Sequence, residues 1–372
     1  MNDRERFIRT MQFKSVDRFP YFELGLWGQT VERYLKEGMP EEAAKDNFFV
    51  GSRFFRLDHR EFAPVNLSMV PGFTSKVYHE DERVVIMRDG TGIVRKGMKE
   101  GTVRGTRPSM DQYVQFPVEN PMDFVAMKLR HDPRTPGRYP ANWPDLVKKW
   151  RRRDYPLCLL TNGSFGFYSH PRKWMGTENL SLAFYDHPKM MHEMMDFLAE
   201  FFIKVTTKAL KELKMDYFNF FEDMAYKTAP LVSPKIFRDF MLRPYKRVIA
   251  HLKRHGVKII TLDTDGNCEP LIPLYIEAGV TCLWPCEIAA NMDPVRLRKE
   301  YGRDLALMGG IDKRELAKGR KEVRAEIKRH LLPLLDSGGF IPHVDHTVPP
   351  DVPFANFMYY LELKRKAAEG KL

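Results

Sequence analysis

Short apolar runs alternate along this chain with longer amphipathic runs. The clearest apolar runs have the length of strands and occupy residues 155–163, 215–223, 257–266, 281–287, 305–312 and 338–346. The intervening segments carry apolar residues at helical spacing, at residues 187–214, 234–255, 269–278, 294–301 and 313–337. Strands that alternate with helices in this way predict a parallel sheet covered by helices.

Two further apolar runs, residues 18–24 and 54–58, bring the expected number of strands to about eight. Eight such units predict a (β/α)8 barrel, or TIM barrel, formed by residues 1–372 as one domain. A doubly wound open sheet is the alternative. No GxGxxG motif follows an expected strand, so a dinucleotide-binding fold has little support.

One segment, residues 75–107, breaks this rhythm. It alternates at a period of two residues and contains turn signals at residues 80–82 and 89–90. This pattern predicts an antiparallel β insertion between early strands of the barrel, placed to act as a lid or as one edge of a pocket.

Composition narrows the classes of protein. The chain has 372 residues, 43% of them hydrophobic, and no apolar run of the length needed for a membrane span. Its first residues are charged rather than apolar, so we expect a cytoplasmic protein without a membrane partner. The four cysteines form no CxxC pair and are expected to be buried thiols: Cys158, Cys268, Cys282 and Cys286.

The chain is basic, with a net charge of +11. Acidic residues interrupt the basic cluster of residues 314–328, and no helix-turn-helix, RNA-recognition or zinc-finger pattern occurs, so we do not expect nucleic-acid binding. The excess charge is typical of solvated helix faces. It also suits an acidic protein partner or an anionic substrate.

Polar residues end most of the expected strands, although carboxylates are depleted within strands. In barrels of this class the reacting groups come from the carboxyl ends of the strands. A carboxylate after a strand can instead cap the next helix, and this role suits Asp312. The remaining groups make up the expected site: Asp58, Glu222, Asp223, Asp263, Asp265, Glu287, His343 and His346.

Asp263 and Asp265 pose a particular question. Residues two apart on a strand point the same way, and two like charges held close cannot both ionise cheaply. The two carboxylates must therefore share a proton, bind a cation or splay apart. Asn267 can cap the helix that follows, so capping does not explain the pair.

Several blocks resemble the uroporphyrinogen decarboxylase superfamily, which also contains zinc-dependent methyltransferases acting with corrinoid proteins. The blocks are RERFIRTMQFKSVDRFPYFE, FFEDMAYKTAPLVSPKIFRDFMLRPYKRVI, DTDGNCEPLIPLYIEAGVTCLWPCE, LALMGGIDK and GGFIPHVDHTVPPDVPFANFMYYLELKRK, and together they cover nearly the whole chain. The resemblance implies a (β/α)8 barrel, in agreement with the strand count.

The methyltransferases of this superfamily bind zinc through a His-x-Cys pair and a later cysteine. The matching positions in this chain are Asp263, Asp265 and His346, which are also acceptable ligands for zinc or another divalent ion. The decarboxylases are similar at Asp265-Gly266 and His346, and Asp58 stands where their catalytic aspartate is expected. Their N-terminal arginines, which grip a porphyrinogen, are absent between Arg18 and Arg33.

The resemblance implies metal-assisted O-demethylation of a small, possibly methoxylated aromatic substrate, with a corrinoid protein as the partner that takes the methyl group. The alternatives are a decarboxylase of a small acid and a non-catalytic barrel subunit. The chain is also a candidate to form a homodimer. The expected catalytic residues are Asp58, Glu222 and Asp223, the expected metal ligands are Asp263, Asp265 and His346, and the expected substrate-binding residues are Trp27, Phe165, Glu287 and His343.

Overall fold

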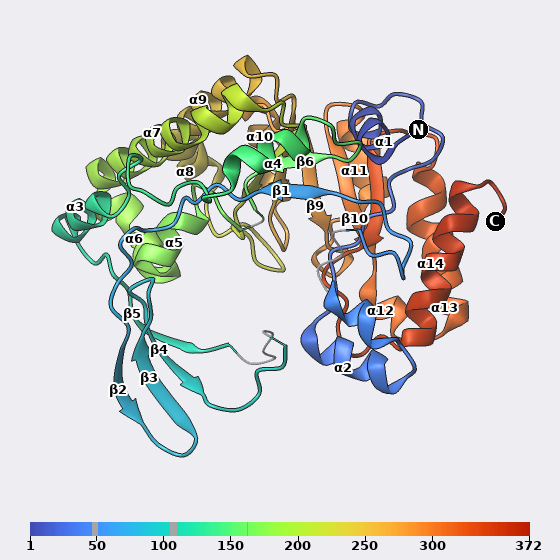
Figure 1. The fold of residues 1–372 in the computed structure, drawn as a ribbon, viewed down its shortest axis with the longest axis horizontal. Coiled ribbons are helices and arrows are strands. Elements are labelled where there is room, and N and C mark those ends of the chain that lie inside the picture. Colours follow the sequence, from blue (N-terminus) through green and yellow to red (C-terminus); the bar gives the residue numbers. More distant parts are fainter. Residues whose placement is uncertain (47–50, 105–109, 162) are drawn as a thin grey trace.

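The computed structural model describes residues 1–46, 51–104, 110–161 and 163–372. Within these residues a curled parallel sheet of seven strands forms the centre, in the order β1-β6-β7-β8-β9-β10-β11. Figure 1 shows this sheet with helices along its outer side. Its strands are Glu61–Ala63 (β1), Leu157–Leu159 (β6), Tyr217–Phe221 (β7), Ile259–Asp263 (β8), Cys282–Cys286 (β9), Ala306–Ile311 (β10) and Phe340–Val344 (β11).

Helices connect and cover these strands. The helix after Asp312 begins at the predicted cap, since the Asp312 carboxylate accepts from the Arg314 N–H, and Asp293 caps the helix that starts at Pro294 in the same way. The helices are Asp3–Met11 (α1), Gly28–Lys36 (α2), Pro121–Leu129 (α3), Trp143–Trp150 (α4), Ser169–Met175 (α5), Thr177–Asp186 (α6), Pro188–Glu212 (α7), Pro234–Ile236 (α8), Leu242–Arg254 (α9), Ile272–Ala278 (α10), Pro294–Tyr301 (α11), Lys313–Leu316 (α12), Arg320–Glu326 (α13) and Phe354–Ala368 (α14).

The six C-terminal strands lie where the apolar runs predict them, although residue 162 is outside the described residues. The predictions of strands at residues 18–24 and 54–58 are wrong. Residues 18–24 have no regular ladder, residues 53–56 form a turn, and the first strand is β1. The sheet is therefore barrel-like, with seven parallel strands in the described residues rather than the eight expected.

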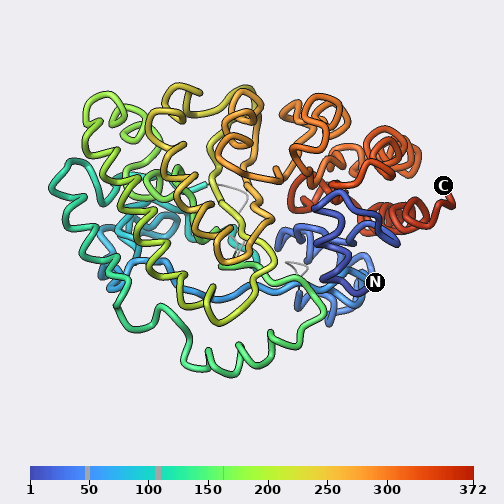
Figure 2. Tube along the Cα trace, turned by 90° about the horizontal axis from the view of Figure 1, so that it is seen from above, coloured from blue at the N-terminus to red at the C-terminus, as the bar shows by residue number. Residues whose placement is uncertain are grey.

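Residues 19–27 fill the space between the two edge strands, β1 and β11, without forming a ladder. The Val344 N–H donates to Glu23 Oε2 over 3.0 Å, and the Asp58 N–H donates to the Tyr21 carbonyl over 3.0 Å. Leu26 makes an isolated bridge to Val348. Individual contacts therefore tie the two ends of the curled sheet together, and the N- and C-terminal parts of the chain lie side by side (Figures 1 and 2).

The predicted antiparallel insertion is present as a separate four-stranded sheet in the order β2-β3-β4-β5. Its strands are Lys76–Glu80 (β2), Val84–Arg88 (β3), Val94–Met98 (β4) and Gln112–Gln115 (β5), so it extends beyond the predicted end. Residues 105–107 of the prediction lie outside the described residues. Because the insertion follows β1 directly, it stands at the carboxyl end of the parallel sheet (Figure 1).

Apolar side chains fill the inside of the curled sheet at its amino end. Phe7 and Met11 of α1 pack there with inward residues of the strands, including Tyr217, Ile259 and Met308. The Thr10 carbonyl accepts from the N–H of Gly339, just before β11, which anchors α1 across this end. The amino end is therefore closed, and the opposite, carboxyl end carries the polar groups. All four cysteines are buried and free, as predicted.

Candidate functional site

Charged and polar groups meet where the strands of the parallel sheet end. They come from the residues directly after β7, β8, β9, β10 and β11, although these segments are far apart in the sequence. The groups are Asp223, Asp263, Asp265, Glu287, Lys313, Asp345 and His346.

Asp265 and His346 form an ion pair at this end. His346 Nε2 lies 3.3 Å from Asp265 Oδ2, and the two side chains are 31% and 40% exposed, so both remain accessible. Burial alone lowers the pKa of His346, but its contact with Asp265 raises that pKa more strongly, and the net change is upward from 6.5. The pair therefore favours a charged imidazolium at the mouth of the sheet.

Asp263 resolves the crowding of carboxylates in another way. It ends β8, is 9% exposed, and has its pKa raised well above the usual range, first by burial and then by the charges of Asp265 and Asp223. Burial and the neighbouring charges therefore favour the protonated form of Asp263. The crowding of the two carboxylates is relieved in two ways, since Asp263 holds its proton more tightly than usual and Asp265 is paired with His346.

Arg172 of α5 reaches the same group of carboxylates. It donates from Nη1 to the Asp223 carbonyl over 2.8 Å and from Nη2 to Asp223 Oδ2 over 3.0 Å. Asp223 has a positive φ of 46°, an unfavourable conformation for a residue with a side chain. The two bonds from Arg172 hold this turn, so α5 and the end of β7 are fixed relative to each other.

Lys313 organises the far side of the site. Its ammonium lies 3.0 Å from Glu287 Oε1 and 3.5 Å from Asp345 Oδ1, while its backbone N–H also donates to Asp345. Burial raises the pKa of Asp345 to about 6. Glu287 additionally accepts from the Gly266 N–H over 2.9 Å, which ties the loop that carries Asp265 to the end of β9. Glu287, predicted to bind substrate, is thus engaged in positioning this loop.

Glu222, predicted to be catalytic, points away from this group. Its two oxygens accept from the backbone N–H groups of Phe167, Tyr168 and Ser169 at 2.7–3.2 Å, and also from the Tyr245 hydroxyl. It is completely buried, and burial raises its pKa to about 7. Glu222 therefore anchors the segment that leads into α5, and no contact places it at the reacting end.

Asp58, the other predicted catalytic carboxylate, lies at the opposite end of the sheet. It precedes β1 instead of ending a strand, and it accepts from Arg18 over 2.7 and 2.8 Å. Arg6 of α1, the helix that closes the amino end, is 3.6 Å away. The expectation that Asp58 shares a cavity with Asp265 and His346 is therefore wrong, because the strand that placed it there does not exist.

The remaining predicted substrate-binding residues are mostly internal. Phe165 is 1% exposed and packs among aromatic rings, including that of Phe202. His343 is 1% exposed, its Nδ1 lies 2.7 Å from the Val344 carbonyl, and burial lowers its pKa to about 3. Trp27 is half-buried and bonds through its backbone to Val348, close in sequence to His346.

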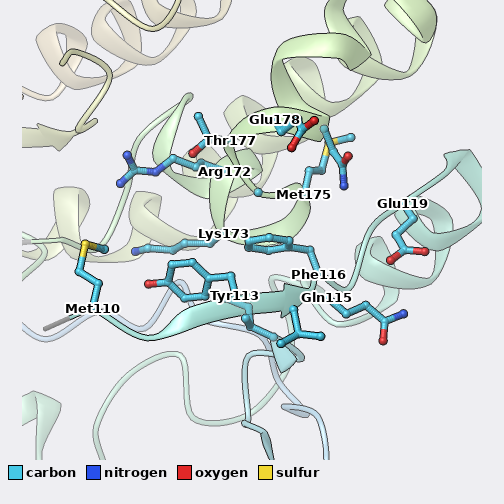
Figure 3. A pocket seen from close by; sticks show the side chains of 14 residues that line it. Met110, Tyr113, Gln115, Phe116, Glu119, Arg172, Lys173, Met175, Thr177 and Glu178 are labelled. Carbon is cyan, nitrogen blue, oxygen red and sulfur yellow. The ribbon is translucent and has the colours of Figure 1, made fainter. Parts of the chain in front are cut away.

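Two cavities, each of about 600 Å³, lie between the antiparallel sheet and the parallel sheet with its helix α5. One lies between β5 and the α5–α6 segment, and Figure 3 shows Arg172, Lys173, Tyr113 and Phe116 around it. The other lies at the carboxyl ends of β1 and β6. Ile93, Tyr113 and Lys173 line both cavities, so the two adjoin. Asp265 and His346 line neither cavity, and Arg172, which lines the first, bonds to Asp223 of the acidic group.

Sequence reasoning missed several of these residues. Arg172, Lys173 and His170 lie in the short helix α5, which has no long periodic pattern, and His131 follows the insertion. A signal was present, since His170, Arg172 and Lys173 fall within ten residues of the end of an expected strand. Lys313 follows β10 closely and was open to the same argument, whereas Asp345 was recognised from the sequence as a polar residue at the end of the last strand but was given no role.

Two of the expected metal ligands, Asp265 and His346, are in direct contact. Among residues 1–46, 51–104, 110–161 and 163–372, no three His, Cys, Asp or Glu side chains converge to hold an ion. Ligands to a divalent ion are ionised carboxylates and neutral imidazoles. The pKa values of Asp263 and His346 are both raised, so an ion would have to displace a proton from each, and the expected metal ligands stay a prediction.

Comparison with known proteins places the chain in a family. The family model for uroporphyrinogen decarboxylase (URO-D) matches residues 110–367. The chain belongs to this family. The sequence-based resemblance is therefore confirmed at the level of the URO-D family.

Individual relatives of the URO-D family are distant. The uroporphyrinogen decarboxylase of Hyphomonas neptunium is 27% identical over 136 residues, which cover 36% of this chain and 38% of that protein. The uroporphyrinogen decarboxylase of Legionella pneumophila (strain Lens) is 25% identical over 135 residues, covering 36% of this chain and 37% of that protein. The matched stretch thus spans under two fifths of these relatives' length.

A solved structure extends the likeness to the whole fold. A methyltransferase from Methanosarcina mazei superposes with a TM-score of 0.60, covering 98% of both chains at 14% identity. At this identity the likeness concerns the fold alone. In the described part of the chain, no helix combines the length and apolar character that crossing a bilayer requires.

Proposed function

We propose that this URO-D family protein is a methyltransferase that removes a methyl group from a small methoxylated aromatic substrate and passes it to a corrinoid protein. The observation that carries the proposal is the accessible ion pair of Asp265 and His346 at the mouth of the sheet. It offers a proton donor at the carboxyl end of the sheet, where a cavity of the size of a small-molecule site also opens after β1 and β6, although neither member of the pair lines that cavity.

The chemistry of an ether explains why such a donor is needed. When the carbon–oxygen bond breaks, its electron pair goes to the oxygen, and an unprotonated alkoxide or phenoxide is a poor leaving group. General acids contribute about 10²- to 10⁴-fold when they protonate such an oxygen in the transition state. His346 suits this role because both ring nitrogens of an imidazolium donate, and only Nε2 faces Asp265.

The neighbouring residues support this role electrostatically. Asp265 favours the charged form of His346, and the raised pKa of Asp263 reduces a second negative charge that would hold the proton too tightly. Arg172 and Lys313 balance the remaining carboxylates, Asp223 and Glu287. A corrinoid, when a partner protein brings it, supplies the cobalt nucleophile that takes the methyl group. The basic character of the chain suits an acidic partner.

Decarboxylation of a small acid is the second candidate. It is favoured by the cations on the cavity wall, Arg172 and Lys173, and by the activity named for the curated relatives. In that reaction the same ion pair would protonate the carbon that loses carbon dioxide. Asp58, expected to serve the decarboxylase, lies at the other end of the sheet and has no part in it.

One assay separates the two reactions. The purified chain is incubated with reduced free cobalamin and a panel of methoxylated and unmethylated aromatic acids. We expect methylcobalamin and the matching phenol in equal amounts, without release of carbon dioxide. Carbon dioxide without methylcobalamin would overturn methyl transfer and establish decarboxylation, and neither product from any substrate would favour a non-catalytic subunit.

The sequence-based expectation of a divalent ion is tested separately. Elemental analysis of the native protein is compared with Asp265→Ala and His346→Ala. A stoichiometric ion that is lost in both variants would restore zinc or a related metal as the group that assists the leaving oxygen. Equal contents, or none, would leave protonation by His346 as the source of assistance.

A further inference from the structure

The cavity at the carboxyl ends of β1 and β6 has walls suited to an aromatic ring. Its volume is about 600 Å³, and the antiparallel sheet contributes one wall through Thr91, Ile93 and Tyr113. Apolar side chains line much of the remainder, namely Val65, Leu67, Met69, Ile93 and Trp174. Small-molecule sites have this character, with a mostly apolar surface and a few convergent polar groups.

Two buried imidazoles supply polar groups of opposite kind in this cavity. His131 Nδ1 lies 3.0 Å from the Met127 carbonyl, which assigns the proton to Nδ1 and leaves Nε2 as an acceptor. His170 Nδ1 accepts from the Gly166 N–H at 3.4 Å, which assigns the proton to Nε2 and makes that nitrogen a donor. Burial lowers the pKa of His131 to about 4 and that of His170 to about 3, so both rings are neutral.

Lys173 supplies a positive charge on the wall of the same cavity. Its ammonium lies 3.4 Å from the Gly163 carbonyl and 5.7 Å from the centre of the Phe221 ring. In the part of the chain that the structure describes, no ion pair within 4.0 Å joins Lys173 to a carboxylate, whereas Arg172 is paired with Asp223. Its side chain is exposed to the cavity, and partial burial together with the charge of Arg172 lowers the pKa of Lys173.

Two hydroxyl groups complete this side of the cavity. Thr161 Oγ1 and Ser164 Oγ lie 2.6 Å apart, and both residues line the cavity together with Lys173. An ammonium that no carboxylate of the described residues neutralises within 4.0 Å, placed beside hydroxyl groups, favours a carboxylate ligand, because the anion can accept charge-assisted hydrogen bonds from the cation and further bonds from the hydroxyls.

We infer that this cavity binds an aromatic carboxylate that carries a ring hydroxyl, with the carboxylate at Lys173 and the hydroxyl between His131 and His170. A hydroxyl group both donates and accepts, so it matches an acceptor nitrogen and a donor nitrogen at once. The inference names the substrate class for the proposed function, and it rests on that function only for the claim that the bound compound reacts.

The binding claim is tested without any methyl acceptor. Isothermal titration of the purified protein uses 4-hydroxybenzoate, its neutral amide 4-hydroxybenzamide, and benzoate, which lacks the hydroxyl. We expect 4-hydroxybenzoate to bind at least tenfold more tightly than either of the others. The amide lacks the charge-assisted hydrogen bonds of the carboxylate, and benzoate lacks the hydrogen bonds of the hydroxyl. Equal affinities, or no binding of 4-hydroxybenzoate, would overturn the inference without any variant.

Variants then assign each preference to a residue. Lys173→Met is expected to weaken 4-hydroxybenzoate about tenfold to a hundredfold and to abolish the preference over the amide, while Lys173→Arg retains that preference. His170→Phe is expected to abolish the preference over benzoate. Lys204→Met, which removes an exposed lysine of α7, is the matched control and should bind like the native protein. Unchanged selectivity in folded Lys173→Met would contradict the assignment.

The outcomes distinguish the site from the reaction. Selective binding of 4-hydroxybenzoate together with no methyl transfer from its methoxylated relatives would keep this site and overturn the proposed function. Methyl transfer from neutral methoxylated compounds that survives in Lys173→Met would keep the function and overturn this site.

Discussion

His346 Nε2 lies 3.3 Å from Asp265 Oδ2, so the loop after β11 touches the loop after β8. In the order of the sheet, β9 and β10 stand between these strands. Neighbouring strands are about 4.8 Å apart, so a flat sheet would separate β8 from β11 by ~14 Å. The ion pair therefore exists because the sheet curls, and the curl brings an acid and a base from distant segments to one mouth.

Removing either member of this pair should lower methyl transfer strongly. We expect Asp265→Asn and His346→Gln each to lower kcat/KM by about a hundredfold or more, because general acid assistance is lost. The rate of methylcobalamin formation measures this loss. Asp145→Asn, at an exposed position of α4, is the matched control. Rates within threefold of native in both site variants would remove the pair from the reaction.

The pH profile should report the protonation of His346. Its pKa is raised above 6.5 because Asp265 outweighs burial, and the charged form is the proposed acid. Activity should therefore be retained below this pKa and fall as the pH rises through it, with a midpoint above 6.5. In Asp265→Asn the residual activity should fall at lower pH, since the cause of the raised pKa is gone. An unmoved midpoint would assign the proton to another group.

Glu222 should make the free energy of unfolding depend on pH. Burial raises its pKa from 4.5 to about 7 in the folded protein, so the folded state binds its proton more tightly than the unfolded state. The free energy of unfolding should therefore decrease as the pH rises from about 4.5 to 7, by about 3 kcal/mol from this group.

Glu222→Gln tests this dependence because the amide cannot ionise. We expect denaturant unfolding of this variant to show a flatter pH profile. We also expect lower stability, because the new NH₂ group is a donor and replaces a carboxylate oxygen that accepts from backbone N–H groups. Glu178→Gln, on the first turn of α6, serves as the control. A profile as steep as that of the native protein would show that Glu222 does not titrate in this range.

Glu23 should contribute more to stability than any surface acid. It is fully buried, and its carboxylate accepts from Lys364 Nζ at 2.8 Å, from the Tyr360 hydroxyl at 2.7 Å and from the Val344 N–H at 3.0 Å. Glu23→Ala leaves a buried ammonium unpaired, which typically costs about 3–5 kcal/mol. Denaturant unfolding measures the loss, and exposed Glu32→Ala on α2 is the control. A loss below about 1 kcal/mol would contradict this role.

Local pattern alone determined much of the fold. The runs at residues 215–223, 257–266 and 305–312 are buried strands, and the helix at residues 294–301 matches α11 to the residue. The antiparallel insertion followed from its period of two. These features were predictable because periodicity and turn chemistry act over a few neighbouring residues, whatever the remainder of the chain does.

Tertiary contacts decided the parts that were mispredicted. Residues 18–24 are apolar like a strand, yet side chains such as Glu23, rather than a ladder, hold them between β11 and β1. Asp58 and Glu222 follow apolar runs like the other candidates. Asp58 lies away from the mouth because it precedes β1 instead of following a strand. Glu222 lies away from it because its side chain binds the backbone of residues 167–169. Neither outcome is encoded in the short-range pattern.

Of the site itself, sequence alone determined that Asp263, Asp265 and His346 end strands and so share one end of the sheet. Only the tertiary structure decided that Asp265 pairs with His346, that burial raises the pKa of Asp263, and that Lys173, His131 and His170 from α5 and the segment after α3 line one cavity. The reason is physical: pairing, protonation and desolvation depend on distances of a few ångströms between segments far apart in the chain, and the curl of the sheet sets those distances.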